Sequence, residues 1–313
     1  MVSLFPFSVV GLGFLFLAAL ECLSAASAPS FLHPSLIRLR FLASLTLSSL
    51  SIVSCLISSF LSSTTATDPL GAALPLSSLG AVTPFLLYSL AGLLSLSSSF
   101  IPFSPFPPSL LDLLLLFSFG QEFLLYYLRR KDIDGVENRY FDLLLVPILV
   151  CAVSTLLALT RPRSPAPRVG RAAGLALQGT WFIQMGFSFF TNVIADGCFL
   201  HERGGVNYTI KCKTHQDYHR GRAIATLQFN CHLAFLVLVG YAVYGVMAGR
   251  TDNAQGYRPL SKEMQMTDVS PSSFTLDSDE EEEIVTAGTN AAKHQNDVVS
   301  PPLGDAESSN GLN

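Results

Sequence analysis

The sequence predicts an all-α polytopic membrane protein: a seven-helix transmembrane bundle followed by a disordered C-terminal tail. Half of the 313 residues are hydrophobic and only 13% are charged, whereas soluble domains carry about 25% charged residues. Apolar runs long enough to span a bilayer as a helix, about 18 residues or more, recur along the chain. A membrane barrel would need short alternating strands, which this sequence lacks. We therefore predict a transmembrane domain over residues 1–249 and a tail over residues 250–313.

The first three spans, predicted over residues 3–26, 41–63 and 75–100, contain few ionisable side chains. Small residues at the end of the first span look like a signal-peptide cleavage site, but no basic segment precedes the apolar run. We expect the first span to be retained, with removal of residues 1–27 as the alternative. Serines of the second span can bond to carbonyls of their own helix and let helices approach closely. We expect them to serve packing and not to line a polar pore.

Charged residues are placed near the ends of the first two spans. Glu21 lies close to the end of the first span, and we interpret it as a carboxylate near water at the membrane surface. Pro29 and Pro34 break the helix that follows. Arg38 and Arg40 then mark the connecting loop.

The fourth span, predicted over residues 109–128, carries Asp112 near one end and Glu122 at greater depth. Ser118, Glu122 and Tyr126 recur every four residues and share one face of the helix. An ionised carboxylate at this depth costs about 3 kcal/mol on insertion scales, so it must face protein or water or be protonated. Glu122 is the strongest functional candidate in the sequence. The alternative is a purely structural carboxylate satisfied by neighbouring helices.

A compact basic loop follows the fifth span, which is predicted over residues 140–160. Prolines alternate with arginines in this loop, and such a segment commonly anchors a protein beside anionic headgroups. Specific lipid binding is the alternative interpretation. The loop contains Arg161, Arg163, Arg168 and Arg171.

Polar side chains are densest in the last two spans, predicted over residues 172–195 and 222–249. Buried amides need hydrogen-bond partners in lipid, so the polar face of each helix should point into the bundle. Glycines on the other side of the sixth span, Gly179 and Gly186, would let a neighbouring helix come close. His232 is either functional or a structural hydrogen-bonding group. The sixth span places Thr180, Gln184, Ser188 and Asn192 on one face beside Gln178 and Trp181, and the seventh contains Thr226, Gln228, Asn230, His232, Tyr241 and Tyr244.

The loop between these spans combines two cysteines with a glycosylation sequon. Cys198 and Cys212 are well placed to form a disulfide, and Asn207 opens the triplet Asn-Tyr-Thr between them. Together they favour a lumenal or extracellular loop. His215 and His219 are four residues apart, as two metal ligands on one helical face would be, but no third ligand is indicated by spacing. We therefore expect no metal site and no cofactor.

The tail is too poor in apolar residues to fold alone. It contains an acidic run after Ser278 and a Ser-Pro pair at Ser270, and both serines are candidate phosphorylation sites. The tail either solubilises the protein or binds cytosolic partners; the acidic charge argues against nucleic acid. Counting Lys and Arg in alternate loops does not decide orientation. The sequon, the cysteine pair and the kinase-like tail favour a lumenal or external N-terminus and a cytosolic tail, in the plasma membrane or the endomembrane system.

Three polar segments resemble the transmembrane protein 45 family of multi-pass membrane proteins. They are residues 177–187 (LQGTWFIQMGF), residues 223–232 (AIATLQFNCH) and, more loosely, residues 121–127 (QEFLLYY). The likeness covers roughly residues 1–250 and is greatest to the plant-type branch, some members of which are described as virus-response-associated. The resemblance implies a multi-pass membrane protein without a settled activity. Other members carry histidines where this chain has Leu128 and residues 137–141, so it carries over only Glu122, Gln178, Trp181, Gln184, Gln228, Asn230 and His232.

Two functions from different classes are compatible with these features. The first is a non-enzymatic protein that acts through partners in membrane trafficking or in a stress or defence response. The alternative is a proton-linked transporter or channel that uses Glu122 and His232 inside the bundle. A seven-span receptor is allowed by the span count but has no motif to support it. A membrane enzyme is disfavoured because the sequence has no nucleophile elbow, His-rich metal motif or phosphate loop.

Overall fold

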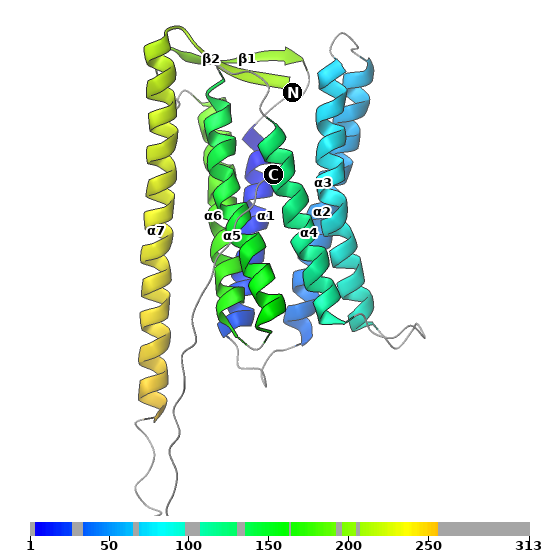
Figure 1. Ribbon diagram of the computed structural model, residues 1–313, viewed down its shortest axis with the longest axis vertical. Coiled ribbons are helices and arrows are strands. Elements are labelled where there is room, and N and C mark those ends of the chain that lie inside the picture. Colours follow the sequence, from blue (N-terminus) through cyan, green and yellow to red (C-terminus); the bar gives the residue numbers. More distant parts are fainter. Residues whose placement is uncertain are drawn as a thin grey trace, which may run out of the picture. The chain divides into compact units, whose positions relative to one another are not determined.

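Each predicted span forms a helix in the computed structural model, which confirms the all-α polytopic fold (Figure 1). The structure describes residues 4–26, 34–64, 69–97, 107–129, 135–162, 164–191, 196–204 and 207–255. The described residues belong to one compact unit, Met1–Gly256. Ser270 and Ser278 lie outside them. The helices are α1 (Leu4–Ala26), α2 (Pro34–Thr64), α3 (Pro69–Leu96), α4 (Pro108–Leu128), α5 (Glu137–Thr160), α6 (Ala166–Phe190) and α7 (His215–Gln255).

Within the described residues, six helices are long and apolar enough to cross a membrane, and α6 is the exception. Its 25 residues would reach about 37 Å at the usual helical rise, which is sufficient to span. Its hydropathy is low because it contains polar residues such as Arg171, Gln178 and Ser188. The side chains of these residues are buried in the bundle and so do not face lipid. The helix that looks least like a membrane span is therefore the one packed against both α1 and α5.

Small residues bring α1 and α6 into close contact. A Cβ atom added to Gly179 would lie 2.7 Å from the carbonyl oxygen of Gly11, and one added to Gly11 would lie 2.7 Å from that of Gly179. Gly186 faces Phe7 and Leu4 in the same way. The close approach predicted for Gly179 and Gly186 is confirmed, and it is the arrangement that small residues permit between membrane helices.

Serines join α2 to α3, which pack mainly against each other. Ser89 donates a hydrogen bond to Ser44 Oγ at 2.8 Å, and both side chains are buried. Ser51 instead donates to the carbonyl of Leu47 in its own helix at 2.9 Å. The bond between Ser89 and Ser44 shows the packing role expected for serines of the second span, although Ser44 and Ser51 also line the cavity described below.

Several helix boundaries differ from those expected. α2 begins at Pro34, so Arg38 and Arg40, which were expected to mark a loop, lie inside a helix, and α7 begins at His215 and not at residue 222. α6 begins at Ala166, with Pro165 as its N-cap and proline in its first turn, where the missing N–H is tolerated. Arg168 and Arg171 were assigned to a basic loop; that assignment is wrong, because both lie inside α6, and Arg171 has only 4% of its surface exposed. At its other end, α7 continues to Gln255, past residue 250, where the tail was expected to begin.

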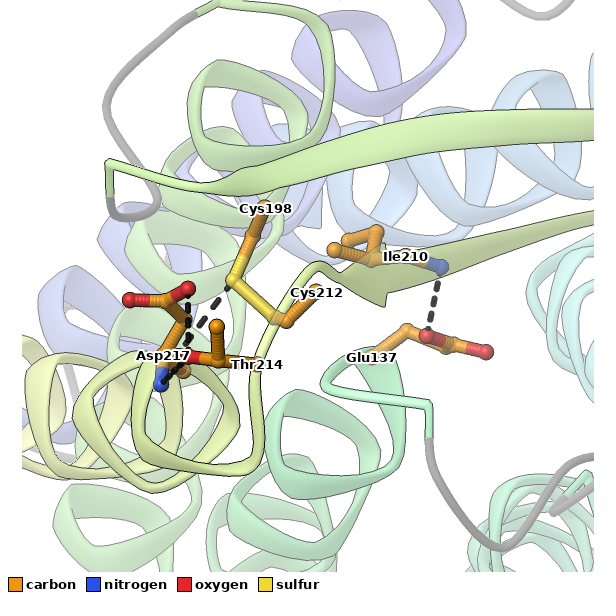
Figure 2. The surroundings of a disulfide bond; sticks show 6 residues. All are labelled: Glu137, Cys198, Ile210, Cys212, Thr214 and Asp217. Atoms are coloured by element: carbon orange, nitrogen blue, oxygen red, sulfur yellow. Dashed lines mark hydrogen bonds between the residues drawn. A yellow bond between two sulfur atoms is a disulfide. The ribbon is translucent and has the colours of Figure 1, made fainter.

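A disulfide-closed hairpin occupies most of the long loop between α6 and α7 (Figure 2). Strands β1 (Cys198–Gly204) and β2 (Asn207–Cys212) pair antiparallel, and a disulfide joins Cys198 to Cys212, the pair expected to bridge. Thr214 Oγ1 accepts a hydrogen bond from the backbone N–H of Asp217 at 3.1 Å, which caps the start of α7. The hairpin lies across the end of the helices at which α7 begins (Figure 1).

The hairpin is fastened to the bundle by a buried contact with α5. The carboxylate of Glu137 accepts a hydrogen bond from the backbone N–H of Ile210 at 2.8 Å. The side chains of Tyr208 and Ile210, both on β2, are buried. Burial raises the pKa of Tyr208 to about 12. The hairpin therefore packs against this end of the bundle through β2 and α5.

Candidate functional site

A partly open cavity of about 590 Å³ lies between α1, α2, α3, α4 and α6, with Phe141 of α5 also in its lining. Along α1 its wall extends from Phe5 to Glu21, a distance of about 24 Å at the helical rise. This is most of the roughly 30 Å thickness of a bilayer's hydrocarbon core. The wall is mainly apolar and aromatic, and it includes Val10, Phe14, Phe85, Leu115, Phe119 and Phe182.

One end of the cavity is lined by a buried group of charges. The carboxylate of Glu21 accepts a hydrogen bond from Arg40 Nη1 at 2.9 Å. Arg171 Nη2 lies 3.2 Å from the same carboxylate. Glu21 and Arg171 are almost fully buried, while the side chain of Arg40 is 21% exposed. One carboxylate thus serves two guanidinium groups on different helices.

A second carboxylate lies at the margin of this group. Asp112 Oδ1 is 3.7 Å from Arg171 Nη1, and the Asp112 side chain is 32% exposed. No hydrogen-bond partner is found for Nε of Arg40, or for Nε and Nη1 of Arg171, among the described residues. The two arginines therefore retain N–H donors that the carboxylates around them do not fill.

The four charged residues come from helix ends on the face opposite the hairpin. Glu21 is near the end of α1, and Arg40, Asp112 and Arg171 are near the starts of α2, α4 and α6. Each lies within about 9 Å of its helix end, which places the group close to the membrane surface and not at the bilayer centre. We call Glu21, Arg40, Asp112 and Arg171 the charged end of the cavity.

Glu122 lines the cavity nearer the hairpin side. Its Oε1 accepts a short hydrogen bond from Gln178 Nε2, which connects α4 to α6. Glu122 Oε2 and Gln178 Oε1 have no partner among the described residues, and both side chains are buried. Tyr126 lines the cavity one turn further on, and Ser118 is fully buried one turn before. The face of α4 that carries Ser118, Glu122 and Tyr126, which was singled out as a candidate functional face, therefore points into the bundle.

The other polar residues of α6 and α7 form a separate network. Tyr140 donates through its hydroxyl to Gln228 Oε1 at 2.9 Å, and Ser188 donates to the same oxygen at 3.4 Å. Gln184 Nε2 donates to Ser188 Oγ at 3.1 Å. Trp181 Nε1 donates to the carbonyl of Tyr140 at 3.0 Å. This network joins α5, α6 and α7, and none of its members is among the cavity-lining residues.

The seven residues carried over from the family resemblance do not form one site. Glu122 on α4 lines the cavity and is bonded to Gln178 on α6, while Trp181, Gln184 and Gln228 belong to the network. The ring of His232 packs edge-on against Trp181, with centroids 6.0 Å apart, and His232 does not line the cavity. Asn230 is exposed on α7. The geometry does not bring Glu122 and His232 together in one cavity.

Each member of the charged end is named in the sequence analysis, but the four were not expected to form one group. Glu21 was interpreted as a carboxylate near water, yet it is 3% exposed and paired with two arginines. A signal was available in the sequence. Successive spans run in opposite directions, so the end of the first span and the starts of the second, fourth and sixth must meet the same membrane face.

The histidines beside the hairpin form a pair and nothing larger. His215 Nε2 and His219 Nε2 are 2.9 Å apart on the first turns of α7. Over the described residues, no three His, Cys, Asp or Glu side chains gather as a metal site. The pair alone does not define a ligand set.

Comparison with protein families gives one match. Residues 108–245 match DUF716, a family of unknown function. The matched region contains α4 to α7, and so includes Glu122, Gln178 and the polar network, while Glu21 and Arg40 lie before it. A search of curated proteins found no match to the chain.

Proposed function

We propose that this chain is a non-enzymatic, transmembrane protein 45-like membrane protein that holds a lipid-like molecule inside its helix bundle. The family of unknown function that matches residues 108–245 is also known by that name. The observation that carries the proposal is the cavity, whose volume falls within the roughly 300–1,000 Å³ typical of small-molecule sites.

The wall of the cavity favours a hydrophobic ligand over water or ions. Phe14, Phe85, Phe119 and Phe182 from four different helices line it. Apolar cavities of this kind do not hold ordered water, because water needs several polar partners. A long hydrocarbon chain fills such a space with dispersion contacts along its whole length. The polar groups at Glu21 and Glu122 would then fix its position.

Photolabelling tests this proposal directly. The full-length protein in phosphatidylcholine nanodiscs is exposed to a C18 fatty acid or a C18 fatty alcohol, each with a mid-chain diazirine. Phe119 is 1% exposed and lines the cavity, whereas Phe117 is 63% exposed on the same helix. We expect at least one probe to label the segment around Phe119. Labelling confined to exposed positions such as Phe117 with both probes would reject an interior site.

A substitution that fills the cavity, paired with the same substitution outside it, tests whether the ligand binds there. Ser48 is buried and lines the cavity, while Ser49 is its half-exposed neighbour and does not. Ser48→Phe should place a ring in the ligand's space and abolish interior labelling. Ser49→Phe makes the same chemical change outside the cavity and should leave interior labelling intact. Equal labelling of the two variants would contradict the assignment.

Proton-linked transport remains the second candidate, and the observation that favours it is that Glu122 lines the cavity. In that case Glu122→Gln would abolish proton-coupled flux in proteoliposomes, while His232→Ala, at a residue that does not line the cavity, would leave it intact. A role in trafficking or in a stress or defence response rests on the acidic tail as a cytosolic binding segment. Deleting residues 257–313 should abolish capture of such partners while interior photolabelling persists.

A further inference from the structure

We propose that the ligand is an anionic single-chain amphiphile, a carboxylate or phosphate monoester, and that Arg40 and Arg171 hold its headgroup. The inference rests on the proposed function and adds to it the chemical class of the ligand, the residues that recognise it and its orientation in the bundle.

The first argument is the supply of hydrogen-bond donors. Arg40 and Arg171 both line the cavity, and Nε of each has no partner among the described residues. A guanidinium group presents its Nε and Nη donors as a planar fork that matches a carboxylate or phosphate. Glu21 occupies part of each fork and cannot fill both. An anionic headgroup would satisfy the buried donors that remain, and an unpaired buried donor is unfavourable.

The second argument is the local charge. Arg168 lies three residues before Arg171 on α6 and so shares its side of the helix. Counting Arg168 together with the charged end gives three arginines and two carboxylates. Of the carboxylates, Asp112 is one-third exposed, and its Oδ1 lies 3.7 Å from Nη1 of Arg171. The charged end alone has two carboxylates and two arginines, and Arg168 beside it adds one further positive charge, which favours an anion over a cation or a neutral group.

The third argument is depth. The charged end lies within about 9 Å of the helix ends opposite the hairpin, close to where lipid headgroups lie. From there the cavity continues past Leu115 and Phe119 toward Glu122. An amphiphile bound here would keep the orientation that it has in the adjoining leaflet, with its head at the surface and its chain toward the middle. It would enter without turning over.

Competition between matched ligands tests the headgroup. Interior labelling by the diazirine fatty acid is competed with oleate, oleoyl lysophosphatidate or oleyl alcohol. We expect one or both anions to compete at a concentration about tenfold lower than the alcohol, because only an anion forms charge-assisted bonds with the arginines. Whichever anion competes better identifies the headgroup as carboxylate or phosphate.

Arginine variants assign the recognition to this end of the cavity. Arg171→Gln should remove the preference for anions over the alcohol, and Arg171→Lys should retain part of it. Arg129 lines the opposite end of the cavity, so Arg129→Gln is the control and should keep the full preference. If Arg171→Gln does not fold, Arg40→Gln serves instead, because that side chain is partly exposed.

The outcomes separate the two proposals. If oleyl alcohol competes as well as the anions, or if the Arg171 and Arg40 variants keep the preference, the headgroup assignment is overturned while the interior site stands. If neither photoprobe labels the cavity, the proposed function fails, and the headgroup assignment fails with it.

Discussion

Glu122 and Gln178 show what a residue pattern can and cannot predict. The four-residue spacing placed Glu122 on an inward face of its helix, and the structure places it there. The pattern could not identify Gln178 as its partner, because periodicity assigns a face to each helix but does not say which helix lies opposite. The charged end illustrates the same limit, since its members are far apart in sequence and each looks unremarkable alone.

The Glu122–Gln178 contact predicts a specific pattern of stabilities. Glu122→Leu should lower the free energy of unfolding by about 1–3 kcal/mol, because it leaves the buried amide of Gln178 without its partner. The double variant Glu122→Leu/Gln178→Leu should recover much of that loss. Denaturation in mixed micelles measures both.

The control for this pair is Gln121→Leu, a change at the exposed neighbour of Glu122 that should be close to neutral. A double variant no more stable than Glu122→Leu would show that the contact between the two side chains is not what stabilises this level of the bundle. Glu122 would then not be a group that stabilises the bundle through its bond to Gln178.

At the scale of the helices, the apolar runs predicted every helix but misplaced the ends of several. Hydropathy reports which residues tolerate lipid, whereas a helix continues until its backbone hydrogen bonds end. α6 therefore starts six residues before its apolar run, through a proline-containing first turn. The hairpin was missed because its strands are short and owe their pairing to the disulfide and to the contact with Glu137.

The contact between α1 and α6 predicts that Gly179→Ala is destabilising. The new Cβ would lie 2.7 Å from a backbone oxygen of α1, so the helices must separate, at a cost of about 1–3 kcal/mol. Gly120 lies on α4 with nothing within 4 Å of an added Cβ. Gly120→Ala should therefore be neutral or stabilising, because alanine favours the helix. Thermal unfolding midpoints of the two variants should differ clearly, and equal midpoints would contradict the close packing.

At the scale of the whole chain, the face that carries the hairpin should be lumenal or extracellular. A disulfide persists in oxidising compartments, and Asn207 begins the second strand of the same hairpin. A peptide-N-glycosidase should increase the gel mobility of the wild-type protein expressed in eukaryotic cells, and it should leave the mobility of Asn207→Gln unchanged.

The opposite face offers a matched control. Pro162→Asn completes a sequon with Ser164 in the connection between α5 and α6. In the Asn207→Gln background it should remain unmodified if that face is cytosolic. Glycosylation there, or its absence at Asn207, would reverse or remove the proposed orientation.

The position of Glu21 has a consequence for how the bundle could respond to its contents. α1 packs mainly against α6, and α2 packs mainly against α3. Glu21 on α1 is bonded to Arg40 on α2, so this ion pair ties one pair of helices to the other. An anion bound to Arg40 would compete with the Glu21 carboxylate for the same guanidinium group. Occupancy of the cavity would then loosen the connection between the α1–α6 pair and the α2–α3 pair, on the face of the bundle opposite the hairpin.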